Sequence, residues 1–359
     1  MIDMEIILAN PRGFCAGVYM AIDVIDQLLD ICPDETIYVY HEIVHNRHVV
    51  ERFIEKGVVF VEDIEETPEG SIVVFSAHGV SPRIREASKK RCLTTVDATC
   101  PLVTKVHAEA IRLARQGYEI LLIGHENHQE VIGTKGEAPD SIRVVESHEH
   151  ARVIEVTEDK PLAYLTQTTL STDDAEVIIN ELTKRFPDIK PPASNSICYA
   201  TTNRQRAVRA LAPSTDLTLV VGSANSSNSV RLAEISENVG TKAHLIDDSS
   251  DIDPDWFAGD DVRKLLLTAG ASAPEDLLRG VIRMLIDRFG GFVEQHHIDH
   301  EDIEFGLPGT LKKLMRKQDI NPSDRRIRIN MSADIDAWFD DQKIQHSTVD
   351  LTVGRSEQE

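Results

Sequence analysis

The sequence has few cysteines and few positive charges for its length. Only five of the 359 residues are cysteine, an odd number that includes no Cys-x-x-Cys pair. This spacing argues against a secreted disulfide scaffold and a local zinc knuckle, and it leaves core thiols, nucleophiles or a long-range metal site. The 38 lysines and arginines are outnumbered by 60 acidic residues, which gives a formal charge of −22. Because such a chain repels nucleic-acid backbones, nucleic-acid binding is not expected as its main task.

Long hydrophobic runs are also missing. No run approaches the ~20 apolar residues that a membrane span needs, and the N-terminus has no basic stretch before an apolar block. We therefore expect a soluble, cytoplasmic protein that binds no membrane. The hydrophobic fraction of 41% supports an ordinary globular core. The length predicts two or three domains.

One local pattern recurs along the chain: a short apolar run, then a small polar cluster, then an amphipathic helix. Such runs lie at residues 5–10, 71–75, 119–123, 161–166, 217–221 and 264–268. Strands that alternate with helices in this way predict parallel α/β sheets. Ligands of such sheets bind beyond the carboxyl ends of the strands, where the polar clusters lie. The pattern therefore predicts several strand ends that converge on one site.

Three of the five cysteines, Cys15, Cys100 and Cys198, lie in these polar clusters. They are 85 and 98 residues apart, which indicates a threefold pseudo-repetition. Any one of them could be a small buried residue, but thiolates at helix N-termini are suited to bind soft metals. Three such ligands can hold zinc with an open fourth position, or a four-iron cluster with one unliganded iron; the spacing does not choose between them. Cys32 and Cys92 are interpreted as structural.

Several histidines follow apolar runs and, with nearby hydroxyl and amide side chains, form a set of hydrogen-bond donors. The candidates are His41, His78, His128, Ser226, Asn228 and Ser272. Donors with little arginine or lysine suit a compact anion such as a diphosphate. The alternative is a structural role. Ser272-Ala-Pro-Glu275 has the pattern of a capping box, and Ser226 and Asn228 could be turn residues.

Glu130, two residues after His128, is the predicted proton carrier. A carboxyl group in a partly dry pocket has a raised pKa and can deliver a proton near pH 7. Thr168 or Thr169 could relay that proton through a hydroxyl group. The alternatives are a solvated loop residue for the glutamate and strand-end hydrogen-bond partners for the threonines.

Eight motifs, in order along the chain, resemble the LytB/IspH family of 4-hydroxy-3-methylbut-2-enyl diphosphate reductases. They are Ala9-Asn-Pro-Arg-Gly-Phe-Cys-Ala-Gly17, His41-Glu-Ile-Val-His-Asn-Arg47, Phe75-Ser-Ala-His-Gly-Val80, Asp97-Ala-Thr-Cys-Pro-Leu-Val-Thr-Lys-Val-His107, Thr166-Gln-Thr-Thr-Leu-Ser171, Ile197-Cys-Tyr-Ala-Thr-Thr-Asn-Arg-Gln205, Gly222-Ser-Ala-Asn-Ser-Ser-Asn-Ser229 and Thr268-Ala-Gly-Ala-Ser-Ala-Pro274. The match runs from about residue 4 to residue 316.

The resemblance implies an α/β fold of three pseudo-symmetric lobes, each with a mostly parallel sheet flanked by helices, around a central iron-sulfur cluster. The implied lobes are residues 15–99, residues 100–193, and residues 1–14 with 194–290. Residues 291–359 would form a C-terminal segment, with an acidic tail from about residue 317 that departs from the family. In this tail Trp338 and Phe339 could dock a short helix, or the tail could be disordered.

The resemblance also implies the site and its chemistry. Cys15, Cys100 and Cys198 would hold one [4Fe-4S] cluster with an open apical iron. The implied diphosphate ligands are His41, His78, His128, Ser226, Ser227, Asn228 and Ser272. Thr168 or Thr169 would lie at the substrate hydroxyl group, and Glu130 would supply protons. The implied reaction converts (E)-4-hydroxy-3-methylbut-2-enyl diphosphate into isopentenyl and dimethylallyl diphosphate, the last step of the methylerythritol phosphate pathway, with ferredoxin or flavodoxin as electron donor.

Two other functions fit the cysteine pattern. One is a zinc hydrolase with three cysteine ligands that acts on a phosphorylated metabolite, and the other is a non-catalytic iron-sulfur sensor. Because the strand ends of each lobe face inward, a monomer is expected.

Overall fold

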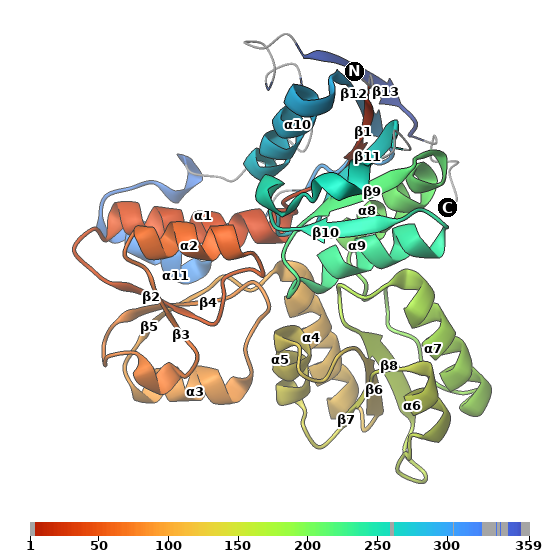
Figure 1. Ribbon diagram of the computed structural model, residues 1–359. Helices are drawn as coiled ribbons and strands as arrows, with labels where there is room; N and C mark the ends of the chain where they lie inside the picture. The colour runs from red at the N-terminus through yellow and green to blue at the C-terminus, as the bar shows by residue number, and fades with distance from the viewer. Residues whose placement is uncertain are drawn as a thin grey trace.

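The computed structural model describes residues 4–258, 262–303, 305–324, 335, 338 and 344–352. Within these residues, three separate β-sheets surround the middle of the molecule, and helices flank each of them (Figure 1). Every strand pair in the three sheets is parallel. The prediction of an α/β fold with three lobes is confirmed.

The largest sheet has the strand order β10-β9-β11-β1-β12-β13, and the two smaller sheets have the orders β3-β2-β4-β5 and β7-β6-β8. The strands are β1 (Met4–Asn10), β2 (Ile37–Tyr40), β3 (Val59–Val61), β4 (Ile72–Phe75), β5 (Thr94–Asp97), β6 (Glu119–Ile123), β7 (Ile142–Val145), β8 (Leu162–Thr166), β9 (Leu217–Val221), β10 (Ala243–Ile246), β11 (Lys264–Ala269), β12 (Gly291–His297) and β13 (Gln345–Asp350). The central strands β4, β6 and β9 are buried along their whole length. Their continuous apolar runs match this burial, because helices cover both faces of a parallel sheet.

Helices connect these parallel strands. They are α1 (Ala16–Ile31), α2 (Arg47–Glu55), α3 (Pro82–Lys90), α4 (Pro101–Arg115), α5 (Gln129–Glu137), α6 (His148–Val153), α7 (Thr172–Arg185), α8 (Tyr199–Leu211), α9 (Ser227–Asn238), α10 (Glu275–Phe289) and α11 (Gly309–Lys317). None of the helices in the described residues is both long enough and apolar enough to cross a membrane.

The C-terminal residues pack against two different lobes. β12 lies beside β1 in the large sheet, with Asn10 opposite His297. Helix α11 lies beside α1 (Figure 1). Its Leu311 and Met315 are buried in the core that α1 shares with the sheet that contains β2 and β4. β13 adds a parallel strand next to β12. The sequence pattern gave no sign of β13, because its residues are mostly exposed and polar, so that it has no apolar run.

Part of the tail packs on the large sheet. Ile335 is buried in the core beneath that sheet, and Trp338 packs against the same core. The guanidinium carbon of Arg12 lies 4.9 Å from the centre of the Trp338 ring. The tail therefore docks through Trp338; Phe339, its expected partner, lies outside the described residues.

Candidate functional site

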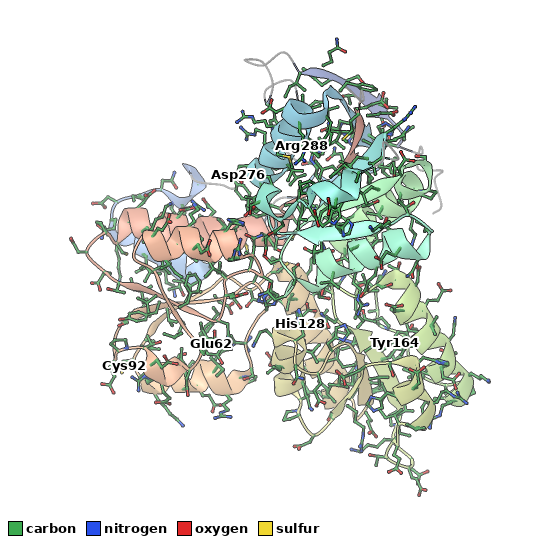
Figure 2. The ribbon with its side chains drawn as sticks, in the orientation of Figure 1. Glu62, Cys92, His128, Tyr164, Asp276 and Arg288 are labelled. Carbon is green, nitrogen blue, oxygen red and sulfur yellow. The ribbon has the colours of Figure 1, made fainter. Side chains whose placement is uncertain are left out.

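A cavity lies where residues that follow the strands of all three sheets come together. Its empty volume is about 740 Å³, open solvent at its mouth included. Among the residues that line it are Cys15, Cys100 and Cys198; His45, His78 and His128; Glu130, Thr168 and Thr169; and Ser226, Ser227, Asn228 and Ser272. Figure 2 shows His128 in the middle of the molecule, whereas Cys92 lies at the outer edge of one lobe. The expected convergence of strand ends is therefore present in the fold.

Each of the three cysteines in the cavity directly precedes a helix. Cys15, Cys100 and Cys198 are the N-cap residues of α1, α4 and α8. Burial raises the pKa of all three thiols, that of Cys198 to about 11, while backbone N–H groups in the first turn of each helix act in the opposite direction. Thiols in such a place ionise when a metal replaces the proton. The other two cysteines are outside the cavity: Cys32 packs partly buried beside α1, and Cys92 is exposed.

A buried arginine of α8 ties this helix, which begins directly after Cys198, to the loop that holds Cys15. The guanidinium of Arg204 donates hydrogen bonds to Gly13 O at 2.9 Å and to Ala200 O at 2.8 Å. Gly13 lies two residues before Cys15, whereas Ala200 lies in the first turn of α8 itself, two residues after Cys198. Glu301, which is also buried, balances the charge of Arg204 at 3.1 Å. An ion pair this deep is costly to break, so it fixes the start of α8 relative to the Cys15 loop.

The three thiols share one cavity, and besides burial the charge of Cys15 raises the pKa of both Cys100 and Cys198. Among the described residues, no group of three His, Cys, Asp or Glu side chains is close enough to hold a single metal ion. At Gly17, an added Cβ would lie 2.5 Å from Cys100 Sγ, so the glycine leaves room for a thiol from another lobe. Three thiols that line one cavity, each at a helix N-terminus, are a donor set suited to a soft metal or an iron-sulfur cluster.

The carboxyl group of Glu130 is buried and bonded on both oxygens to one residue. Thr168 N donates to Oε1 at 2.6 Å, and Thr168 Oγ1 donates to Oε2 at 2.8 Å. Burial raises the pKa of Glu130, although both hydrogen bonds from Thr168 act against it. Thr169 also lines the cavity, and its hydroxyl oxygen accepts a bond from Gln167. Glu130 is therefore not the solvated loop residue that was the alternative.

Three histidine rings form a cluster on one wall of the cavity. His45 stacks on His78 with 4.0 Å between ring centres, and His128 meets both rings edge-on. Burial lowers the pKa of His128 to about 3 and holds that of His78 well below its usual value. Both rings are therefore neutral at pH 7 in the protein alone. Glu130 N donates to His128 Nδ1, which leaves the proton of the neutral ring on Nε2.

The structure brings His45, not the predicted His41, into this cluster. His41 directly follows β2 at a φ of 58°, and its Nδ1 lies 2.6 Å from Glu62 Oε2, outside the cavity lining. The chain turns there, and His45 takes the position before Asn46, the N-cap of α2. His128 is itself the N-cap of α5, whereas His45 precedes the N-cap Asn46, so no single capping rule picks out both histidines.

The polar turns before α9 and α10 form another part of the cavity wall. Ser272 Oγ donates to His45 O at 2.8 Å and lies 3.2 Å from Ser226 Oγ. The capping-box alternative for Ser272 is wrong, because α10 begins at Glu275 with Pro274 as its N-cap. Asn228 is buried, and neither polar atom of its side chain has a hydrogen-bond partner. A buried, unsatisfied amide that faces a cavity is ready to bind a polar ligand.

The fold and the cavity together define a three-lobed α/β protein with a central ligand site built from helix N-termini. The family model for the LytB protein matches residues 6–286, and the chain belongs to the LytB family. Two curated relatives are both named 4-hydroxy-3-methylbut-2-enyl diphosphate reductase. The relative from Rhodopirellula baltica is 52% identical over 89% of this chain and 99% of its own length. The relative from Nocardia farcinica is 51% identical over 87% of this chain and 92% of its own.

Solved structures show the same relationship. The E-1-hydroxy-2-methyl-but-2-enyl-4-diphosphate reductase from Plasmodium falciparum superposes with a TM-score of 0.85 at 39% identity, over 88% of this chain and 99% of that chain. A second structure, of (E)-4-hydroxy-3-methyl-but-2-enyl diphosphate reductase, described as the terminal enzyme of the non-mevalonate pathway, gives a TM-score of 0.57 at 32% identity, over 79% and 99%.

Proposed function

We propose that this protein is a 4-hydroxy-3-methylbut-2-enyl diphosphate reductase. It removes the hydroxyl group of (E)-4-hydroxy-3-methylbut-2-enyl diphosphate and releases isopentenyl and dimethylallyl diphosphate. The observation that supports this most is that three thiols, a buried carboxylic acid and a set of anion-binding donors line one cavity. The reaction replaces a C–O bond with a C–H bond, so it consumes two electrons and two protons and releases one water.

The cofactor we propose is one [4Fe-4S] cluster, held by Cys15, Cys100 and Cys198. When bound, it supplies the electrons and one iron atom to which no protein side chain is bound. The chain contributes three thiolates at helix N-termini and the space left by Gly17. Membership of the LytB family, with relatives named as reductases, favours the cluster over the zinc hydrolase.

Glu130 and Thr168 supply the proton for the leaving hydroxyl group. Thr168 Oγ1 donates to Oε2 of the ionised carboxylate at 2.8 Å. When Glu130 is protonated this bond reverses, and the threonine hydroxyl passes a proton to the departing oxygen, which leaves as water. Thr169 lies next to this pair and helps to orient the substrate alcohol. Because the carboxyl group is buried, water does not compete for its proton.

The diphosphate binds to His45, His78, His128, Ser226, Ser227, Asn228 and Ser272. His128 donates from Nε2 while it is neutral, and the Asn228 amide gains the partner it lacks. His45 takes the place that the sequence assigned to His41.

Ferredoxin or flavodoxin is the proposed electron donor, and the protein acts as a monomer in the cytoplasm. The substrate is a small molecule, and neither nucleic acid nor a membrane takes part.

Anaerobic turnover of the purified protein tests the proposed function. With a reduced dye and the allylic diphosphate, we expect both five-carbon diphosphate products and a brown protein that contains iron and sulfide. A colourless protein with stoichiometric zinc would contradict the reductase. A cluster without turnover would instead favour the sensor.

Replacing Gly17 with alanine should lower the iron and sulfide content of the anaerobically purified protein. The new Cβ would lie 2.5 Å from Cys100 Sγ, so the thiol must move. Gly280→Ala is the matched control, because Gly280 lies in α10 and an added Cβ meets nothing within 4 Å. That change should leave the iron content unchanged and stabilise the fold by about 0.4–1 kcal/mol. Equal iron content in both variants would show that the space at Gly17 is not needed.

A further inference from the structure

Glu42 connects the histidine cluster to the polar turn of another lobe. Its Oε2 lies 3.0 Å from His45 Nδ1 and accepts a hydrogen bond from Asn225 Nδ2 at 2.8 Å. Glu42 and His45 belong to the loop between β2 and α2, whereas Asn225 belongs to the loop between β9 and α9. Asn225 directly precedes Ser226 in the cavity wall. The carboxylate of Glu42 thus joins the His45 ring to the turn before α9, and both line the same cavity.

The three clustered rings differ in what meets their Nδ1 atoms. His128 Nδ1 accepts from a backbone N–H, and His78 Nδ1 lies 3.3 Å from the hydroxyl of Ser76. His45 Nδ1 instead meets the carboxylate of Glu42. The hydrogen bond to His45 lowers the pKa of Glu42, so this carboxyl group is ionised at neutral pH.

An ionised carboxylate beside Nδ1 determines in which protonation state His45 can donate a hydrogen bond to an anion. Glu42 has only acceptor atoms, so His45 Nδ1 must carry a proton. A neutral His45 would then present an unprotonated Nε2, which cannot donate to a phosphate oxygen. A doubly protonated ring donates to Glu42 from one nitrogen and to the ligand from the other. Charge-assisted bonds of this kind are stronger than those between neutral groups.

We propose that Glu42 is a positioning residue for the diphosphate: it holds His45 as the cationic ring of the cluster and, through Asn225, joins that ring to the serine turn. The inference rests on the proposed diphosphate site. His78 and His128 then serve as neutral donors beside one cation. This division of roles places the positive charge at the seam between two lobes.

Glu42→Gln tests this role in the cluster-loaded protein, with inorganic diphosphate as the probe. Gln keeps the size of the side chain and an acceptor for one bond but removes the charge. We expect diphosphate to bind about tenfold more weakly. In turnover, KM for the allylic diphosphate should rise by a similar factor while kcat changes little, because the proton donor is untouched. Iron content and melting temperature should equal those of the parent protein.

The chain offers a close control in His41 and Glu62. Their carboxylate and imidazole lie 2.6 Å apart on the same lobe, outside the cavity lining. Glu62→Gln removes the same charge and should leave diphosphate binding unchanged. Asn225→Ala removes the bond between the lobes but leaves Glu42 on His45, so its effect should be smaller than that of Glu42→Gln.

Three outcomes would overturn the proposal: parent-like diphosphate binding in Glu42→Gln, an equal loss in Glu62→Gln, or an equal loss in Asn225→Ala. The last would mean that the contact between the lobes, not the charge on His45, is responsible. If Glu42→Gln weakens diphosphate binding but the parent does not turn over the allylic substrate, the inference holds and the proposed function fails.

Discussion

Glu130→Gln is expected to retain the cluster and to lose about 10²–10⁴-fold in turnover, the range typical of a general acid. The amide keeps the shape of the side chain and can still accept the bond from Thr168 N, but it has no acidic proton. Turnover with the allylic diphosphate and a reduced dye measures the loss, and iron and sulfide analysis shows whether the site is intact.

Glu126→Gln is the matched control for this prediction. Glu126 lies in the loop directly before α5, the helix that holds Glu130, but its side chain is exposed and pairs with Lys135 at 2.8 Å. Its replacement should leave turnover unchanged. Full activity in Glu130→Gln would show that another group supplies the proton.

The pH profile gives an independent check on Glu130. Burial raises its pKa, so the carboxyl group stays protonated at a higher pH than an ordinary glutamate. Turnover should therefore be complete below this raised pKa and fall as the pH rises through it. The residual activity of Glu130→Gln should lack this alkaline limb. A parent profile that rises with pH across the same range would contradict the assignment.

Cys100→Ser is expected to abolish the bound cluster and all turnover, the largest effect of any single change. Cys100 lies against the first turn of α1, where it brings a thiol from a second lobe toward Cys15. A serine hydroxyl does not ionise near neutral pH and is a harder ligand, so iron should be lost. Iron and sulfide content and visible absorption after anaerobic purification measure this loss.

Cys92→Ser and Cys32→Ser separate the ligands from the other cysteines. Cys92 is exposed, and Cys32 packs beside α1, so neither lines the cavity. Both variants should retain the iron content and turnover of the parent. Cluster loss in either would refute the division of the five cysteines.

The local sequence pattern predicted the fold class and many of the residues that line the cavity. Apolar runs such as β6 and β9, each buried from end to end, predicted parallel strands because both faces of such a sheet are covered. The three cysteines of the cavity lie at helix starts, which the local sequence pattern predicts. Strand β13 was not predicted. It pairs with β12 through its backbone and leaves most of its side chains exposed, so its sequence has no apolar run.

The choice between His41 and His45 needed the tertiary structure. Both residues stand in the same motif, but a left-handed turn at His41 sends that ring to Glu62 and the next helix start brings His45 onto His78. Ser272 likewise fitted a capping pattern, yet its hydroxyl bridges His45 and Ser226 from two other loops. All of these contacts join residues from different loops, and those of Ser272 reach 46 and 227 positions along the chain, so no local pattern encodes them.

The sequence by itself therefore determined which kinds of residue end the strands, and with them the α/β class and the three candidate thiols. Only the tertiary structure decided which of those side chains face one another and which face solvent. The physical reason is that strand and helix periodicity is a local property of the chain. The direction of a loop depends instead on backbone turns and on partners supplied by other lobes.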